Sequence, residues 1–120
     1  MTTTSAHAAD TFFAAAAAGD WDAMRAAVAE NAVFWQNVDG TERGLEQVIR
    51  YTGKLQRTGG FEYLDVRRLL ADDGFCEQHT VRFHDAAGTT TAEYAVCVVA
   101  RVDEAGLITR LDEYLDGSPG

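Results

Sequence analysis

The order of the expected elements constrains the fold of this chain more than any other feature, because helical patterns come first and strand patterns follow. The alanine-rich run FFAAAAAGDW predicts a helix that ends at Gly19, since alanine has the highest helix propensity. Asp20 then caps a second helix. The apolar stripe of that helix is expected to hold Trp21, Met24 and Val28. A third helix lies within GLEQVIRYTGKLQRTGG and stops at its final glycine pair.

Strand patterns account for most of the remaining chain. The segment AVFWQN predicts one strand before the third helix, and four more follow it: FEYLDVRRLLA, FCEQHTVRFH, TTAEYAVCVVARV and LITRLDEYLD. Helices followed by an antiparallel meander indicate an α+β fold whose helices cover one face of a curved sheet. We expect a single domain over residues 1–120, with a flexible arm at 1–5 and a flexible tail at 117–120.

Composition and charge argue against several classes of function. The 120 residues carry a formal net charge of −9, so nucleic acid and anionic membranes, which bind basic patches, are not expected partners. No apolar run approaches the roughly 20 residues of a membrane span, and the opening MTTTSAHAAD lacks a signal-peptide pattern. Cys76 and Cys97 are too few for a disulfide scaffold and lack zinc-ligand spacing, so we expect reduced thiols in a cytoplasmic protein. No metal and no organic cofactor are predicted.

Side-chain alternation separates an inward face from an outward face on the late strands. The inward residues of FCEQHTVRFH are expected to be Phe75, Glu77, His79, Val81 and Phe83. Those of the next strand are expected to be Tyr94, Val96, Val98 and Ala100. A two-residue turn at Gly88–Thr89 would place His79 opposite Val98, and the next turn would then place Val98 opposite Leu111. The inward set of the last strand becomes Thr109, Leu111, Glu113 and Leu115.

Three polar residues therefore fall on a mostly apolar face, and each requires a partner, water or a ligand cavity. Glu113, between Leu111 and Leu115, is either a general base whose pKa is raised by desolvation or a hydrated carboxylate at the mouth of a cavity. His79 is either a general acid or a core histidine with a satisfied hydrogen bond. Glu77 either pairs with His79 or faces solvent, and we favour solvent.

The segment AVFWQN ends on an aromatic residue and an amide that share one face of the strand. Trp35 is predicted to form a wall of a ligand pocket. Asn37 is predicted to position a water or carbonyl group there, unless it serves only in the following turn. Tyr94 is either an acid, a pocket wall or a packing residue. The residues expected to contact a ligand are Trp35, Glu77, Val81, Phe83, Tyr94, Val96, Val98, Leu111 and Leu115.

These patterns resemble the nuclear transport factor two superfamily, which includes SnoaL-like polyketide cyclases, ketosteroid isomerases and limonene-epoxide hydrolases. The resemblance rests on AADTFFAAAAAGDWDAMRAAVAENAVFWQNVDG, GLEQVIRYTGKL and the closing ITRLDEYLD, and it spans almost the whole chain. It implies a cone-shaped α+β barrel. It also implies a homodimer that pairs through the outward sheet face, on which we expect Cys97, Val99 and Ile108.

The site pattern is most similar to that of limonene-epoxide hydrolases. WQN matches their Tyr-Gln-Asn, which places Trp35 at the tyrosine position, and Glu113 matches their water-activating aspartate. His79 and Val81 fall where that family has an arginine and a second aspartate. Trp35 has no hydroxyl and Val81 has no proton to give, so His79 or Glu77 would have to supply the acid.

The resulting expectation is an enzyme that uses Glu113, His79 and Asn37 for acid/base chemistry on an apolar or polycyclic organic molecule. Cyclisation, isomerisation and epoxide opening all agree with such a group of residues. The alternatives are a binding protein whose cavity holds a small ligand without catalysis, and an accessory protein whose sheet only mediates dimers.

Overall fold

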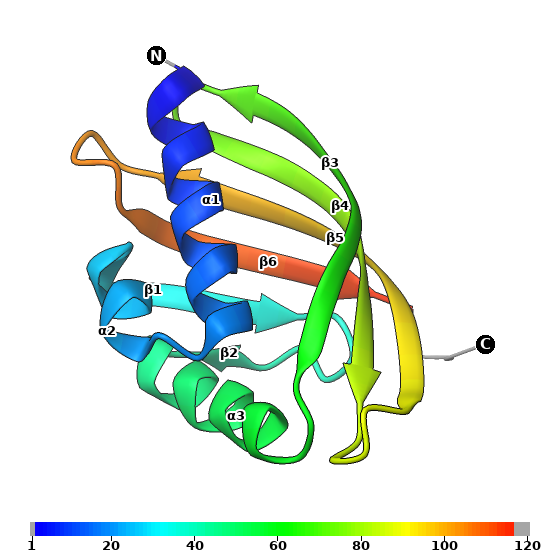
Figure 1. Cartoon of the computed structure of the whole chain (residues 1–120). Coiled ribbons are helices and arrows are strands. Elements are labelled where there is room, and N and C mark those ends of the chain that lie inside the picture. The colour runs from blue at the N-terminus through cyan, green and yellow to red at the C-terminus, as the bar shows by residue number, and fades with distance from the viewer. Residues whose placement is uncertain (1, 117–120) are drawn as a thin grey trace.

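The structure is a computed structural model that describes residues 2–116, and the expected tail at 117–120 lies outside this range. Figure 1 shows three helices on one face of a six-stranded sheet. The elements are α1 (Thr2–Ala18), α2 (Trp21–Ala26), β1 (Val28–Gln36), β2 (Glu42–Arg43), α3 (Leu45–Arg57), β3 (Phe61–Ala71), β4 (Gly74–His84), β5 (Thr90–Val102) and β6 (Ile108–Leu115).

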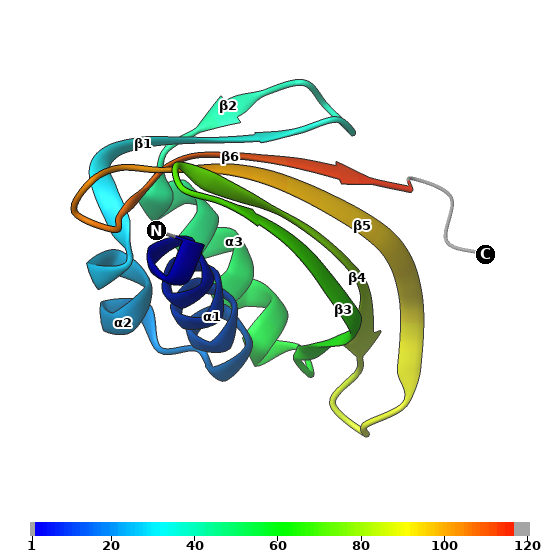
Figure 2. The ribbon, with the colours of Figure 1, turned by 90° about the horizontal axis from the view of Figure 1, so that it is seen from above.

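The sheet has the strand order β2-β1-β6-β5-β4-β3, and all its pairs are antiparallel except β1–β6. Figure 2 shows the sheet curving around the helices without closing. The predicted α+β cone, with helices on a curved and mainly antiparallel sheet, is thereby confirmed. Because all three helices lie on the concave side, that side holds both the core and any internal cavity.

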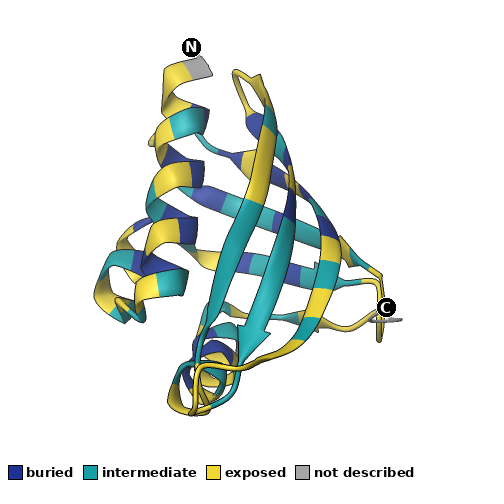
Figure 3. Cartoon of the chain, turned by 45° about the vertical axis from the view of Figure 1, so that its right-hand side comes forward, coloured by how far each residue is buried: buried dark blue, intermediate teal, exposed yellow. Residues whose placement is uncertain are grey.

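Buried residues concentrate where α1 faces the sheet, as Figure 3 shows. Phe12 stacks on Phe34 of β1 with ring centroids 5.9 Å apart, and Phe13 makes an edge contact with Phe75 of β4. The expected flexible arm is instead helical from Thr2 onward. The buried Ser5 explains the difference, since its hydroxyl donates to the carbonyl of Ala71 at 2.6 Å and fixes the first turn of the helix against β3.

The short helix α2 forms as expected, because the carboxylate of Asp20 accepts a hydrogen bond from the backbone N–H of Ala23. Met24 is buried, as the apolar stripe predicts. Val28 does not belong to this helix but begins β1, so the strand starts earlier than the AVFWQN pattern indicated.

The β4–β5 pairing is shifted by two residues from the expected register: His79 lies opposite Val96, and not opposite Val98. The turn and a register irregularity beside it, between Phe83 and His84, are together the cause. The carboxylate of Asp85 accepts two backbone N–H groups at 3.0 Å, and Gly88, at φ 83°, donates to the carbonyl of Asp85. This Asp-x-x-Gly turn is longer than a two-residue hairpin. A shift of two residues leaves every side chain on its predicted face.

The β5–β6 turn repeats the same arrangement with Asp103 and Gly106. Together with a register irregularity between Arg101 and Val102, this turn places Val98 opposite Glu113, and not opposite Leu111. The same irregularity brings Ile108 into the core, where it is fully buried, so its predicted place on the outward face is wrong.

Gly59, at φ 134°, joins α3 to β3 where the chain passes the end of β4. A Cβ atom there would lie 2.2 Å from the carbonyl oxygen of His84.

We expect Gly59→Ala to lower the free energy of unfolding by about 2–4 kcal/mol, measured by urea denaturation. Gly40→Ala is the matched control, because Gly40 also has a positive φ but a Cβ atom there would have no neighbour within 4 Å. This variant should lower the free energy of unfolding by only about 1 kcal/mol. Equal losses would show that the close approach is unimportant.

Candidate active site in the cone

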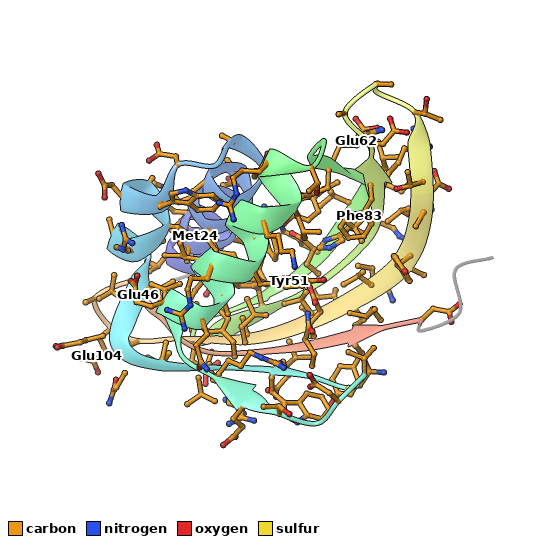
Figure 4. All side chains as sticks on the ribbon, turned by 90° about the horizontal axis from the view of Figure 1, so that it is seen from below. Met24, Glu46, Tyr51, Glu62, Phe83 and Glu104 are labelled. Atoms are coloured by element: carbon orange, nitrogen blue, oxygen red, sulfur yellow. The ribbon has the colours of Figure 1, made fainter. Side chains whose placement is uncertain are left out.

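A cavity of about 760 Å³ lies between α3, the C-terminal half of α1 and the concave face of the sheet. In Figure 4, Tyr51 of α3 and Phe83 of β4 lie on opposite sides of this space. The cavity is lined by most of the predicted catalytic and ligand-contacting residues, namely Trp35, His79, Val81, Phe83, Tyr94, Val96, Leu111, Glu113 and Leu115. Three predicted site residues, Asn37, Glu77 and Val98, do not line it.

Glu113 enters the cavity from β6 beside the parallel strand β1. The side-chain amide of Gln36, its register partner, donates a hydrogen bond to Oε1 of Glu113. Burial raises the pKa of Glu113, while the Gln36 hydrogen bond and the nearby His79 act in the opposite direction. Oε2 has no hydrogen-bond partner among the described residues. A carboxylate with one oxygen fixed and the other available can exchange a proton with a bound molecule.

His79 is held by a buried carboxylate from its own strand. Nδ1 of His79 lies 2.5 Å from Oε2 of Glu77, and both side chains are only 1% exposed. Nε of Arg68 donates to the other carboxylate oxygen at 2.5 Å, and Arg68 also pairs with the exposed Asp10 of α1. The expectation that Glu77 faces solvent is therefore wrong, and its alternative pairing with His79 is confirmed. Glu77 is buried because Arg68 neutralises its charge.

Tyr63, on β3, is a further polar residue in the cavity. The centroid of its ring lies 4.7 Å from the ring centroid of His79. It also contacts Phe13 edge-on, with ring centroids 5.3 Å apart. Burial raises the pKa of the Tyr63 hydroxyl, and the negative charges of Glu113 and Glu77 raise it further. Tyr63 therefore stays protonated near neutral pH and can donate a hydrogen bond to a bound molecule.

The residues at the end of β1 differ from the prediction. The inward positions belong to the buried Phe34 and to Gln36. Trp35 borders the cavity, but its ring packs edge-on against Tyr114, which is 46% exposed and does not line the cavity. Asn37 instead exchanges hydrogen bonds with the backbone of Leu115, at 2.9 and 3.2 Å. The amide that reaches the site is thus Gln36, because the inward face of β1 is occupied by its even-numbered residues.

Val98 is fully buried in the core and lies in one row between Glu77 and Glu113 on the neighbouring strands. The Cα atoms of Glu77 and Glu113 are therefore two strand spacings, or about 10 Å, apart. The cavity thus has two separate polar positions on an otherwise apolar sheet face. Within residues 2–116, no group of three or more His, Cys, Asp or Glu side chains could hold a metal ion, and no helix is long and apolar enough to cross a membrane.

The raised pKa of Glu113 predicts how stability depends on pH. A carboxyl group with a higher pKa in the folded than in the unfolded state stabilises the fold fully below its unfolded pKa. This contribution is lost as pH rises from about 4.5, the ordinary value, through the folded pKa. Urea denaturation between pH 4 and 8 should therefore show Glu113→Gln gaining stability relative to the wild type as pH rises. A constant difference would contradict the raised pKa.

The geometry of the cone agrees with comparisons to known proteins. The model of the SnoaL-like domain matches residues 9–111, which is most of the chain. The chain belongs to the SnoaL-like family. The resemblance predicted from the sequence is confirmed at this level, while no curated protein matches the chain significantly.

Several solved structures are similar to this SnoaL-like protein. An LEH-like epoxide hydrolase from M. tuberculosis is 27% identical, with a TM-score of 0.78 over 96% of this chain and 84% of the other. A candidate polyketide cyclase from Xanthomonas campestris pv. campestris is 21% identical, with a TM-score of 0.79 over 96% and 92%. An NTF2-like protein from Burkholderia xenovorans LB400 is 17% identical, with a TM-score of 0.78 over 97% and 92%. The last two comparisons establish a shared fold only.

Proposed function

We propose that this SnoaL-like protein is an enzyme that applies acid/base chemistry, without a cofactor, to an apolar or polycyclic molecule held in the cone. The observation that carries the proposal is the presence of two hydrogen-bonded titratable groups on the sheet side of one cavity: Glu113 bound to Gln36, and His79 bound to Glu77. Each group has one atom fixed by the protein and another available to a ligand. Groups whose only role was structural would more often have both atoms paired.

Glu113 is the proposed general base. Its raised pKa brings the carboxylate closer to neutral pH, where a base is most effective. Gln36 fixes the orientation of the carboxylate in place of the predicted Asn37. The second position, with His79 and the hydroxyl of Tyr63, lies where it can exchange a proton with, or donate a hydrogen bond to, the other end of the reacting group.

Cyclisation, isomerisation and epoxide opening all need a base on one side of a substrate and a proton donor on the other. Epoxide opening is supported by the similarity to the LEH-like epoxide hydrolase. In that case Glu113 would deprotonate a water molecule, which attacks an epoxide carbon, and the donor group would protonate the oxygen that leaves that carbon.

A non-catalytic ligand-binding protein is the alternative, and an experiment can separate the two. Native mass spectrometry of the purified protein should first identify any small molecule retained in the cavity. That molecule, with a panel of apolar epoxides and ketones, is then tested for both binding and conversion. Conversion of a bound compound supports the enzyme, whereas tight binding of several compounds without conversion supports the alternative.

We also propose a homodimer that pairs through the outward sheet face. Exposed apolar side chains on β3, β5 and β6 of this sheet include Val66, Leu69, Val99 and Tyr114. Ile108 is not among them because it is buried. We expect light scattering at micromolar concentration to give twice the mass of the 13.0 kDa chain, and Val99→Glu to shift the mass toward the monomer. A wild-type protein that is monomeric at this concentration would contradict the proposal.

A further inference from the structure

A chain of charged groups leads from the surface of α1 to the inner end of the cavity. Asp10 is 70% exposed, Arg68 is 22% exposed, and Glu77 and His79 are buried. The contacts run in that order, from Asp10 through the guanidinium of Arg68 to Glu77, and from Glu77 to Nδ1 of His79. Arg68 contacts both carboxylates but does not itself line the cavity.

The hydrogen bonds of Glu77 determine which nitrogen of His79 carries a proton. Arg68 can only donate, so Glu77 accepts at Oε1, and its carboxylate forms an ion pair with this guanidinium at 2.5 Å. An ionised carboxylate has no proton to give, so the proton between Glu77 and His79 belongs to Nδ1. When the ring is neutral, Nε2 must then carry a lone pair.

Nε2 is the nitrogen of His79 that is not held by Glu77, and His79 lines the cavity although its side chain is only 1% exposed. Nε2 makes no hydrogen bond to any described residue. It is also not sealed in the core, because within residues 2–116 the one fully buried side-chain nitrogen or oxygen without a partner is Nδ1 of His84. The other groups around the ring are Phe13 of α1, Tyr63 of β3 and, from β6, the charge of Glu113. None of them is hydrogen-bonded to Nε2.

We propose that Arg68 is a positioning residue that, through Glu77, fixes the tautomer of His79 so that its neutral ring presents an unprotonated Nε2 to the cavity. His79 is then a proton acceptor, and not the general acid that its residue type first suggested. A hydroxyl or N–H group of a ligand that faces His79 can donate to Nε2, whereas an epoxide or ketone oxygen would accept from the hydroxyl of Tyr63. Tyr63 is left as the neutral hydrogen-bond donor in this part of the cavity.

The tautomer can be measured directly by two-dimensional ¹⁵N NMR of the histidine rings at pH 8, with His79→Gln used to assign the signals of His79 among the three histidines. The wild type should show a protonated Nδ1 and an unprotonated Nε2. In Arg68→Met, Glu77 loses its cation and takes up a proton that it donates to Nδ1, so the proton of the ring moves to Nε2. Arg68→Lys should retain the wild-type pattern.

Arg67→Met is the matched control, because it removes the same charge from the adjacent, exposed position and should leave the His79 signals unchanged. A wild-type ring protonated at Nε2, or an Arg68→Met variant with the wild-type pattern, would overturn the proposal. If Arg68→Met fails to fold, Glu77→Gln tests the same step: a neutral amide can donate to Nδ1 and should increase the Nε2–H tautomer. An unchanged ring in Glu77→Gln would also overturn it.

The ligand class is tested with 2-naphthol and its methyl ether as probes, which have similar shapes but differ in one donor hydrogen. We expect 2-naphthol, and not the ether, to shift the Nε2 signal of His79. Equal shifts, or none from either probe, would overturn the assignment of a donor ligand. Neither NMR measurement requires turnover, so failure of this inference and failure of the proposed enzymatic function can be distinguished.

Discussion

Glu113→Gln is expected to reduce turnover of any substrate by about 10²–10⁴-fold while leaving ligand binding nearly intact. The amide keeps the shape of the side chain but cannot accept a proton from the substrate or from water. Because the variant also removes a buried charge, its free energy of unfolding at neutral pH should be equal to or higher than that of the wild type. Steady-state kinetics and urea denaturation on the same preparations measure both effects.

Glu104→Gln is the control, since Glu104 lies exposed in the β5–β6 turn, far from the cavity (Figure 4). It makes the same chemical change and should alter neither turnover nor binding. If Glu113→Gln turns substrate over at the wild-type rate, Glu113 is not the base. If turnover is lost together with stability, the variant has damaged the fold, and the base assignment gains no support.

Phe13→Ala is expected to produce the largest loss of stability, about 3–5 kcal/mol. Phe13 is 6% exposed, and its ring contacts four others. These are the rings of Phe12, Tyr63, Phe75 and His79, whose centroids lie 5.3 to 6.2 Å from that of Phe13. Its removal leaves a void between α1 and the sheet and deprives His79 and Tyr63 of a common support. Urea denaturation should show the loss, and activity should fall further than the unfolded fraction explains.

Phe83→Ala provides the comparison, because Phe83 is only partly buried at the far side of the cavity and contacts two rings, those of Phe61 and Tyr94. It should cost clearly less stability than Phe13→Ala. If the two variants lose equal stability, the cluster around Phe13 is not the packing centre that supports the site.

The sequence was sufficient to predict the fold because its local patterns agree with one another. The alanine-rich run and the Asp20 cap predicted the first two helices, and the alternation along β4, β5 and most of β6 predicted their inward faces. The register was wrong by two residues at both hairpins. A signal was present, since each turn has an aspartate three residues before its glycine, at Asp85 and at Asp103, but it was interpreted as a shorter turn.

The candidate site was only partly predictable. Glu113 and His79 could be found because polar residues stand out on an apolar strand face. Gln36 was missed because the inward face of β1 was assigned to Trp35 and Asn37, although Phe34 and Gln36 form the alternative alternating pair. Arg68 could not be linked to Glu77 from the sequence, because an irregularity in β3 between Leu64 and Arg67 sets which of its residues face inward.

The most direct test of catalysis in the cone is isotope incorporation. Apolar epoxides are incubated with the wild type, with Glu113→Gln and without protein in H₂¹⁸O, and apolar ketones are incubated in D₂O, before mass spectrometry. We expect the wild type to introduce ¹⁸O into a diol product or deuterium at carbon in at least one bound compound. Glu113→Gln should bind that compound but introduce label about 10²–10⁴-fold more slowly. Bound compounds that acquire no label above the protein-free rate with the wild type would contradict the account and leave a ligand-binding protein.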